Sequence, residues 1–239
     1  MEKEEIKKVE TNSNFPQHIG ILIDGNRRWA KEKGLPSFRG HLRGIQRVVE
    51  IIRYARKKGI KVLTLYGFST ENWKRSKEEV NYLMNLFTEF ARRYAKEFHK
   101  LGIRFRQIGK RDRLPKTLME EIIKAEKITK NNKEMVVNIA LDYGGRDEIV
   151  RAIRKIVSKK LKPKEITEEV LMEYLDTEGL PDVDFVIRTS GEMRLSNFLP
   201  LQTTYAEFYF PKIYWPDFDK KQFDLALEEF TKRQRRFGK

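Results

Sequence analysis

The stretch HIGILIDGNRRW, residues 18–29, decides the fold. Residues 18–24 form a short, mainly apolar run, which is typical of a strand buried within a sheet. The run ends at Asp24, and Gly25 then turns the chain into a polar segment with the character of a helix start. A buried strand that passes directly into a helix predicts the α/β class, in which helices surround a mostly parallel sheet.

The same alternation of strand and helix continues along the chain. We expect further strands at 61–68, 103–109, 134–142, 183–188 and 205–210. We expect helices at 44–58, 76–99, 115–130, 145–159, 165–175 and 217–236, and the second of these opens with a capping box of Ser76 and Glu79. The pattern predicts one domain over residues 15–239. Residues 1–14 are predicted to be a flexible tail and not a secretory signal, because their start is highly charged and lacks an apolar core.

Composition restricts the classes of function. Cysteine is absent, which excludes disulfides, thiolate metal sites and cysteine nucleophiles and fits a cytoplasmic location. No run approaches the roughly 20 apolar residues that a membrane-spanning helix needs. The 50 Lys and Arg residues exceed the 35 Asp and Glu residues, for a net charge of +15. This excess suits a polyanionic partner such as nucleic acid, acidic lipid or a phosphorylated substrate, although a highly charged soluble surface would explain it equally well.

Charged residues gather where the predicted strands end. Asp24 is followed by a glycine turn and two arginines, and helix N-termini and guanidinium groups both bind phosphate. A carboxylate fits such a place if a hard cation bridges it to the phosphate, whereas a plain helix cap with solvated arginines is the alternative. Because ligands of parallel sheets bind beyond the carboxyl ends of the strands, we expect these residues to share one rim.

The later strands end in a similar way. Arg188 ends the fifth predicted strand, Arg194 and Ser196 follow it, and the three form a second candidate phosphate site, with a flexible surface loop as the alternative. Glu207 lies within the aromatic strand 205–210, where a carboxylate either faces outward or binds a ligand. The sequence lacks the P-loop, dinucleotide-binding and G-x-S-x-G patterns. Two diphosphate groups and a metal ion are therefore the predicted ligands.

Five stretches, in chain order, resemble the motifs of the cis-prenyltransferases, the family of undecaprenyl and dehydrodolichyl diphosphate synthases. They are HIGILIDGNRRWAK, LTLYGFSTENWKR, NIALDYGGRDEIV, IRTSGEMRLSNFLPLQ and YAEFYFPKIYWPDF, and the match runs from about His18 to Gly238. The resemblance implies a homodimer with a six-stranded, mostly parallel sheet. It also implies Mg²⁺-dependent condensation of isopentenyl diphosphate with an allylic prenyl diphosphate, farnesyl or geranylgeranyl. The implied product is a polyprenyl diphosphate, a lipid-carrier precursor of the undecaprenyl or dolichol kind, and its release implies transient contact with a membrane surface.

The resemblance also implies roles for individual residues. Asp24 matches the catalytic aspartate that holds Mg²⁺, Glu207 matches the other acidic position of the metal site, and Asn72 matches a catalytic position. The residues implied to bind substrate are Gly25, Asn26, Arg27, Arg28, Trp29, Arg39, His41, Phe68, Ser69, Glu71, Trp73, Arg75, Arg188, Arg194, Ser196, Arg236 and Gly238. Among these, Gly25, Asn26, Arg27 and Arg28 match the loop that binds the allylic diphosphate, and His41 and Arg75 match positions that contact the same group. Phe68, Ser69, Glu71, Asn72 and Trp73 match a motif that orders the substrates and a mobile loop. Arg188, Arg194 and Ser196 match the isopentenyl diphosphate site, and Arg236 and Gly238 match an element that completes the partner subunit's site.

Three positions depart from the pattern of many bacterial members. Arg27 replaces a glycine, Ser37 replaces an arginine for which Arg39 is a candidate substitute, and Met193 replaces a histidine. Together with the abundance of Lys and Glu, these departures favour an archaeal type of enzyme.

Two other classes of function are compatible with the composition. A non-catalytic partner subunit of the same fold would typically lack the first acid or the arginines, whereas Asp24, Arg188, Arg194 and Glu207 are all present. A nucleic-acid-binding protein would fit the positive charge, but the sequence shows no recognisable binding module. We therefore predict an enzyme with no nucleic-acid partner.

Overall fold

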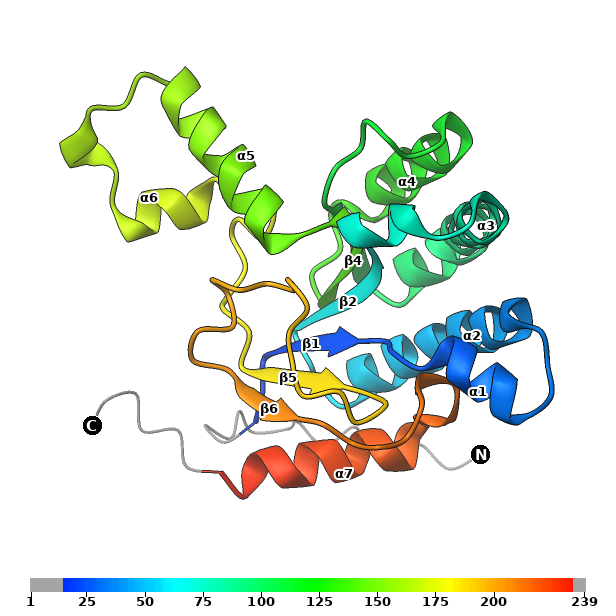
Figure 1. Cartoon of the computed structure of the whole chain (residues 1–239). Helices are drawn as coiled ribbons and strands as arrows, with labels where there is room; N and C mark the ends of the chain where they lie inside the picture. The colour runs from blue at the N-terminus through cyan, green and yellow to red at the C-terminus, as the bar shows by residue number, and fades with distance from the viewer. Residues whose placement is uncertain (1–14, 234–239) are drawn as a thin grey trace.

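A six-stranded sheet forms the centre of the protein (Figure 1). The structure is a computed structural model, and it describes residues 15–233. The strands are β1 (His18–Leu22), β2 (Val62–Ser69), β3 (Ile103–Ile108), β4 (Met135–Tyr143), β5 (Phe185–Arg188) and β6 (Glu207–Tyr209). They lie in the order β3-β4-β2-β1-β5-β6, and every neighbouring pair is parallel. The predicted α/β class and six-stranded sheet are confirmed.

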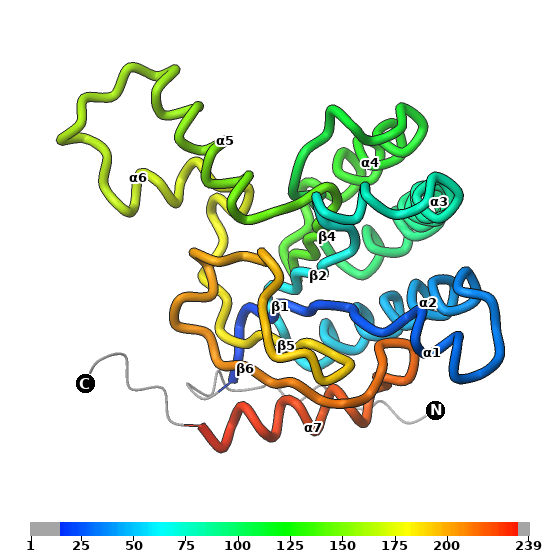
Figure 2. The backbone as a smooth tube through the Cα atoms, viewed as in Figure 1, coloured from blue at the N-terminus to red at the C-terminus, as the bar shows by residue number. Residues whose placement is uncertain are grey.

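Helices flank this sheet. They are α1 (Asn26–Glu32), α2 (Ser37–Lys57), α3 (Lys77–Lys100), α4 (Lys116–Thr129), α5 (Gly145–Ser158), α6 (Glu168–Glu173) and α7 (Lys220–Thr231). α3 packs between α2 and α4, while α7 lies against α2 and β6. Figure 2 shows α5 and α6 standing out from the rest of the chain as a projecting arm. The capping box at α3 is confirmed on the Ser76 side, since its hydroxyl accepts a hydrogen bond of 3.2 Å from the backbone N–H of Glu79.

Helix α2 begins seven residues earlier than the predicted helix 44–58, because its first two turns contain glycines that do not look helical. These glycines are needed for close packing of α1 against α2. A Cβ atom at Gly40 would lie 2.0 Å from the backbone oxygen of Asn26, and one at Gly44 would lie 2.4 Å from the Asn26 side chain. The glycines therefore fix α1 next to the carboxyl end of β1.

The core lies between the sheet and α2, α3 and α4. Strand β1 is buried along its whole length, as expected for a central strand of a parallel sheet. On α3 the apolar side chains that face the sheet and the neighbouring helices are buried, including Leu83, Phe87 and Phe98. Helix α6 is shorter than the predicted 165–175, and α7 starts three residues after the predicted position 217 and ends at Thr231. Helix α7 starts only at Lys220 because Asp219 caps it, accepting a hydrogen bond from the N–H of Gln222.

A polar chain crosses the buried sheet at His18. Its Nδ1 lies 2.7 Å from the carbonyl oxygen of Pro181, so it donates there, and its Nε2 lies 2.8 Å from the hydroxyl of Thr64. The amide of Asn138 donates to the same hydroxyl, whose own proton is available to Nε2. With Nε2 accepting that proton, the imidazole is neutral. Burial accordingly lowers the pKa of His18 to about 4, against the smaller opposing effects of the Pro181 carbonyl and Asp184.

Acid should therefore destabilise the fold through His18. The pKa in the folded chain lies below its ordinary value of 6.5, so the unfolded chain binds the proton more readily between these values. We expect the free energy of unfolding to fall by about 3 kcal/mol from this residue as the pH drops from 7 to 4. Urea unfolding of the wild type and His18→Gln across this range measures the effect. The variant should show the flatter pH dependence, and equal slopes would contradict the assignment.

Candidate active site

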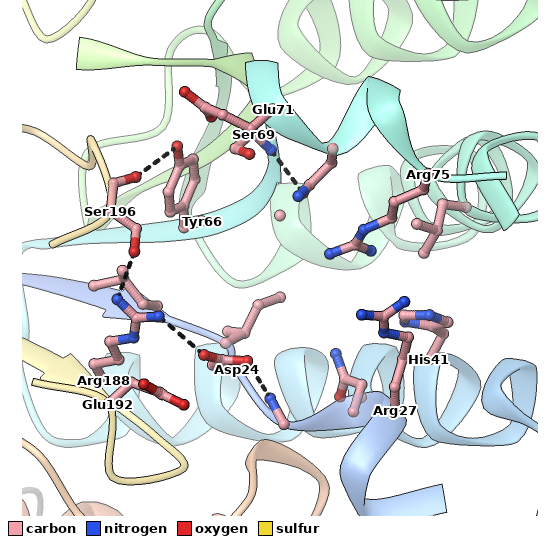
Figure 3. Close-up of a pocket in the computed structure, with 18 of the residues that line it drawn as sticks. Asp24, Arg27, His41, Tyr66, Ser69, Glu71, Arg75, Arg188, Glu192 and Ser196 are labelled. Atoms are coloured by element: carbon pink, nitrogen blue, oxygen red, sulfur yellow. Dashed lines mark hydrogen bonds and ion pairs between the residues drawn. The ribbon is translucent and has the colours of Figure 1, made fainter. Parts of the chain in front are cut away.

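A cavity of about 820 Å³ lies beyond the carboxyl ends of β1, β2 and β5, where parallel sheets bind ligands. Figure 3 shows polar side chains from several elements pointing into it. The predicted residues that line it are Asp24, Gly25, Asn26, Arg27, Arg28, His41, Ser69, Glu71, Asn72, Arg75, Arg188, Arg194 and Ser196. The structure thus brings most of the predicted site residues together in one cavity.

Asp24 lies where β1 leaves the sheet, and its side chain is about one-third exposed. One carboxylate oxygen accepts a hydrogen bond of 2.7 Å from the N–H of Gly25. The other accepts one of 3.1 Å from Arg188, and Arg28 lies 3.4 Å from the first oxygen. The backbone on both sides of the carboxylate is held by Thr189, whose hydroxyl bonds to the N–H and C=O of Asp24. The carboxylate is therefore fixed in place between two guanidinium groups.

Gly25 makes the turn that opens α1 toward the cavity. Its φ of 103° lies in the left-handed region, which favours glycine. A Cβ atom there would also lie 2.7 Å from the ring of Tyr214. A substitution at Gly25 would therefore displace α1 and the arginines it carries.

Arg188 forms the buried side of the cavity, with a relative exposure of 5%. Its guanidinium donates to the hydroxyl of Ser196 at 2.8 Å, to the carbonyl oxygen of Arg194 and to Asp24. Its Nε is buried and has no hydrogen-bond partner among the described residues. The loop that supplies Ser196 turns sharply, because Ser196 and Asn197 both have left-handed backbone, with φ of 48° and 67°.

A second group of basic side chains lies on the other side of the cavity, where Figure 3 shows Arg27, His41 and Arg75 together. All three contact Glu79, at 3.5, 3.2 and 3.1 Å respectively. Burial lowers the pKa of His41; Glu79 opposes that shift and Arg75 reinforces it. One carboxylate against two arginines leaves this side of the cavity positive, as a diphosphate requires.

Comparison with known proteins agrees with this geometry. A family model described as a putative undecaprenyl diphosphate synthase, of the prenyltransferase family, matches residues 22–238. The chain belongs to this family. An isoprenyl transferase of Streptococcus pneumoniae is 46% identical over 244 residues, covering 99% of this chain and 97% of that protein. A Legionella pneumophila protein named ditrans,polycis-undecaprenyl-diphosphate synthase ((2E,6E)-farnesyl-diphosphate specific) is 45% identical over 231 residues, covering 95% and 97%.

Solved structures show the same fold. Lavandulyl diphosphate synthase from Lavandula x intermedia, in complex with dimethylallyl diphosphate, has a TM-score of 0.92 and 39% identity, covering 95% of this chain and 100% of that one. A probable undecaprenyl diphosphate synthase from Campylobacter jejuni has a TM-score of 0.79 and 35% identity, covering 94% and 99%. The predictions of a prenyltransferase and of its family are confirmed. The archaeal type stays a prediction.

Several predicted substrate-binding residues of this prenyltransferase do not line the cavity. Phe68 is fully buried in the core, and Trp73 donates its indole N–H to Asp142 at 2.8 Å. Arg39 is exposed and lies over the ring of Phe38, with 5.5 Å from its Cζ to the ring centroid. Trp29 is half-buried on α1, beneath the ammonium group of Lys33. Arg236 and Gly238 lie outside the described residues.

Glu207 is not brought to Asp24 within one chain. It opens β6 and pairs with Phe185 at the start of β5, whereas Asp24 follows the carboxyl end of β1. Its carboxylate instead bonds to Arg233 at 2.9 Å. Residues 15–233 contain no group of three acidic, His or Cys side chains placed to hold a metal. The expected sharing of a metal with Asp24 therefore does not occur inside one chain, because the register of β6 places Glu207 at the amino end of the sheet.

Three residues of the site were missed or misjudged from sequence. Glu79 was expected only to cap α3, yet it contacts Arg27, His41 and Arg75. Its spacing of four residues from Arg75, which lies just before α3, was the available signal. Glu192 bonds to Arg28 and Arg194, at 3.0 and 2.6 Å. Asn197 joins the loop of Ser196 to Glu71, through a hydrogen bond of 3.2 Å that only the folded chain reveals.

Proposed function

We propose that this prenyltransferase condenses isopentenyl diphosphate with an allylic prenyl diphosphate, farnesyl or geranylgeranyl, and repeats the step to give a cis-polyprenyl diphosphate. The observation that supports this is the placement of two cationic groups on opposite sides of Asp24 in one cavity. Arg27, His41 and Arg75 are suited to the allylic diphosphate, while Arg188, Arg194 and Ser196 are suited to isopentenyl diphosphate. This assignment follows the roles that the motifs imply.

The reaction joins two carbon atoms and releases one diphosphate. The allylic carbon–oxygen bond breaks, and the diphosphate leaves with the electron pair. The double bond of isopentenyl diphosphate supplies the electrons of the new carbon–carbon bond, and a proton then leaves to restore a double bond in the cis configuration. Arg27 and Arg75 stabilise the charge that develops on the leaving group. The fixed Arg188 orients the second substrate, so that the reacting carbons meet.

We propose Asp24 as the protein ligand of Mg²⁺. Mg²⁺ in proteins is commonly held by one or two carboxylates together with substrate phosphate oxygens and water. A single, partly exposed carboxylate at the edge of the cavity fits that ligand set. When bound, the ion would neutralise negative charge on the leaving diphosphate. Glu207 stays part of this proposal only as a residue that a second copy of the chain brings to the site.

The prenyl tail of the allylic substrate needs an apolar surface next to the phosphate groups. The same cavity is lined on one side by Ile45 of α2 and by Leu83, Leu86 and Phe87 of α3. These side chains lie beside Arg75 and His41, so a diphosphate held there would direct its hydrocarbon between α2 and α3. The cavity therefore joins the polar and apolar parts that an allylic diphosphate carries.

We propose that the enzyme is a homodimer. Three apolar side chains on α5, Val150, Ile153 and Val157, are 45%, 49% and 67% exposed. They follow one another at intervals of three and four residues, so they form a continuous stripe on a helix that projects from the chain. A second copy would cover this stripe. Sedimentation of the wild type should give the mass of two chains, and Ile153→Asp should shift it toward one.

None of the helices within residues 15–233 is both long and apolar enough to cross a membrane. We propose that the enzyme works in the cytoplasm and touches a membrane surface to release its product, since a polyprenyl chain is insoluble in water. The net charge of +15 would favour a leaflet rich in anionic lipids.

Incubation with radiolabelled isopentenyl diphosphate, Mg²⁺ and one allylic starter tests the function. Geranyl, farnesyl and geranylgeranyl diphosphates are compared in separate reactions, and the extracted products are sized by chromatography. We expect label in long prenyl chains with at least one starter and none when Mg²⁺ is chelated. A failure to incorporate label with all three starters would refute the proposed activity.

A further inference from the structure

The segment after β2, a 3-10 helix η1 (Thr70–Lys74), carries residues both into the cavity and away from it. Glu71 and Asn72 line the cavity, and the side chain of Asn72 accepts a hydrogen bond of 3.0 Å from the N–H of Ser69. Trp73 is the next residue, and it does not line the cavity. The packing of Trp73 therefore influences where Asn72 and Glu71 lie.

Trp73 is held on three sides. Its indole N–H donates to the carboxylate of Asp142 at 2.8 Å. The ring of Phe68 packs edge-on against it, with 5.1 Å between centroids and an interplanar angle of 79°. The guanidinium of Arg113 lies over the indole, with its Cζ 5.2 Å from the ring centroid. A guanidinium in this position makes a cation–π interaction with the indole ring in addition to packing against it.

Asp142 and Arg113, which both contact Trp73, also form an ion pair with each other. Asp142 is completely buried near the carboxyl end of β4, and its carboxylate accepts two hydrogen bonds from the guanidinium of Arg113, one of them 2.9 Å long. Arg113 comes from the loop between β3 and α4, and its side chain is 42% exposed. Asp142 also has a left-handed backbone, with φ of 49°. Both a buried carboxylate and this backbone conformation are unfavourable by themselves.

We propose that Arg113 and Asp142 are positioning residues that hold Trp73 and, through it, keep Asn72 and Glu71 in the geometry that catalysis requires. Stability alone does not explain this ion pair, because an apolar pair of similar size commonly stabilises a buried site equally well or better. The ion pair also fixes the orientation of Trp73. The carboxylate of Asp142 orients the indole N–H, and the guanidinium of Arg113 covers the face of the ring. Two elements distant in sequence, the β3–α4 loop and the end of β4, thereby fix the segment that follows β2.

The test compares Arg113→Met with a matched control, Arg111→Met. Arg111 lies on the same loop, is 44% exposed and bonds to Glu126 at 2.6 Å, so it matches Arg113 in exposure and in pairing with a carboxylate. It differs in lacking the contact with Trp73 and in having a partner that is 25% exposed, whereas Asp142 is buried. With both substrates saturating, we expect Arg113→Met to lower kcat by about tenfold or more, because displaced catalytic groups lose their transition-state contacts. Arg111→Met should stay within about twofold of the wild type. Asp142→Asn, which keeps an acceptor for the indole, should lower kcat less than Arg113→Met and serves as the second variant if Arg113→Met does not fold.

A double-mutant cycle that combines Arg113→Met with Trp73→Phe separates positioning from a general structural role. If Arg113 acts through Trp73, the double variant should be no slower than the slower of the two single variants. Additive losses in kcat would overturn the proposal, as would a folded Arg113→Met or Asp142→Asn enzyme with normal kcat. The inference rests on the proposed function, and the wild-type assay distinguishes the two failures. An inactive wild type would refute the prenyl transfer, whereas an active wild type with an unaffected variant would refute only the role of this pair.

Discussion

Replacing Asp24 by asparagine should lower kcat by about 10³-fold or more while the chain stays folded, because the charge that the reaction uses is lost. Asparagine has nearly the same shape and can still accept the hydrogen bond that Gly25 donates at 2.7 Å. It cannot balance the positive charge of Arg188 and Arg28 or serve as an anionic ligand of Mg²⁺. The loss should therefore fall on turnover more than on the folding of α1.

Steady-state kinetics with both substrates and Mg²⁺ saturating measure this effect. Glu192→Gln is the matched control, because Glu192 is another carboxylate at the cavity and is also bonded to two arginines. It contacts Arg28 but not Arg188, and we expect its loss to be far smaller. Equal melting temperatures for wild type and Asp24→Asn would show that the fold is intact. A variant with Asp24→Asn that retains a tenth of the wild-type kcat would refute the assigned role.

The location of the site could be predicted because it follows from topology. Buried strands that alternate with helices give a parallel sheet, and the carboxyl ends of such strands meet at one edge. Residues at or just after the carboxyl end of a strand, such as Asp24, Ser69 and Arg188, therefore come together whatever the details of the helices. All three line the cavity.

Side chains within a strand were harder to place. Glu207 falls in a short aromatic run, and the direction of its side chain and its distance from Asp24 depend on where β6 starts to pair with β5. The structure pairs Glu207 with Phe185 and gives it Arg233 as a partner. Nothing local in the sequence fixes that register. A shift of one residue would turn the side chain of Glu207 to the opposite face of the sheet.

Contacts between distant segments escaped prediction altogether. Arg113 and Asp142 are 29 residues apart, and in the sequence Arg113 looks like an ordinary loop residue and Asp142 like the last residue of a strand. Glu79 showed only its local role as a helix cap, although the folded chain places it against Arg27 and His41 from other helices. Such pairings depend on how α1, α2 and α3 pack, which residue spacing along the chain does not determine.

Arg188→Lys should raise the KM for isopentenyl diphosphate by about 100-fold, because a buried guanidinium makes directed hydrogen bonds that an ammonium cannot reproduce together. Arg188 bonds at the same time to Ser196, to the carbonyl oxygen of Arg194 and to Asp24. Lysine keeps the positive charge but presents it from a single point, so the substrate phosphate would meet a cation whose position is less well defined. The KM for the allylic substrate, which the group around Arg75 is proposed to bind, should change by no more than about threefold.

Initial rates with each substrate varied in turn separate these effects, and Arg194→Lys is the matched control. Arg194 belongs to the same loop, but its side chain is 62% exposed and bonds to Glu192. An exposed arginine that makes one ion pair loses less on replacement by lysine than a buried one with three partners, so we expect a change in KM of about tenfold or less. If Arg188→Lys raised the KM of both substrates equally, the two cationic groups would not be separate binding sites. The assignment of one diphosphate to each side of Asp24 would then be wrong.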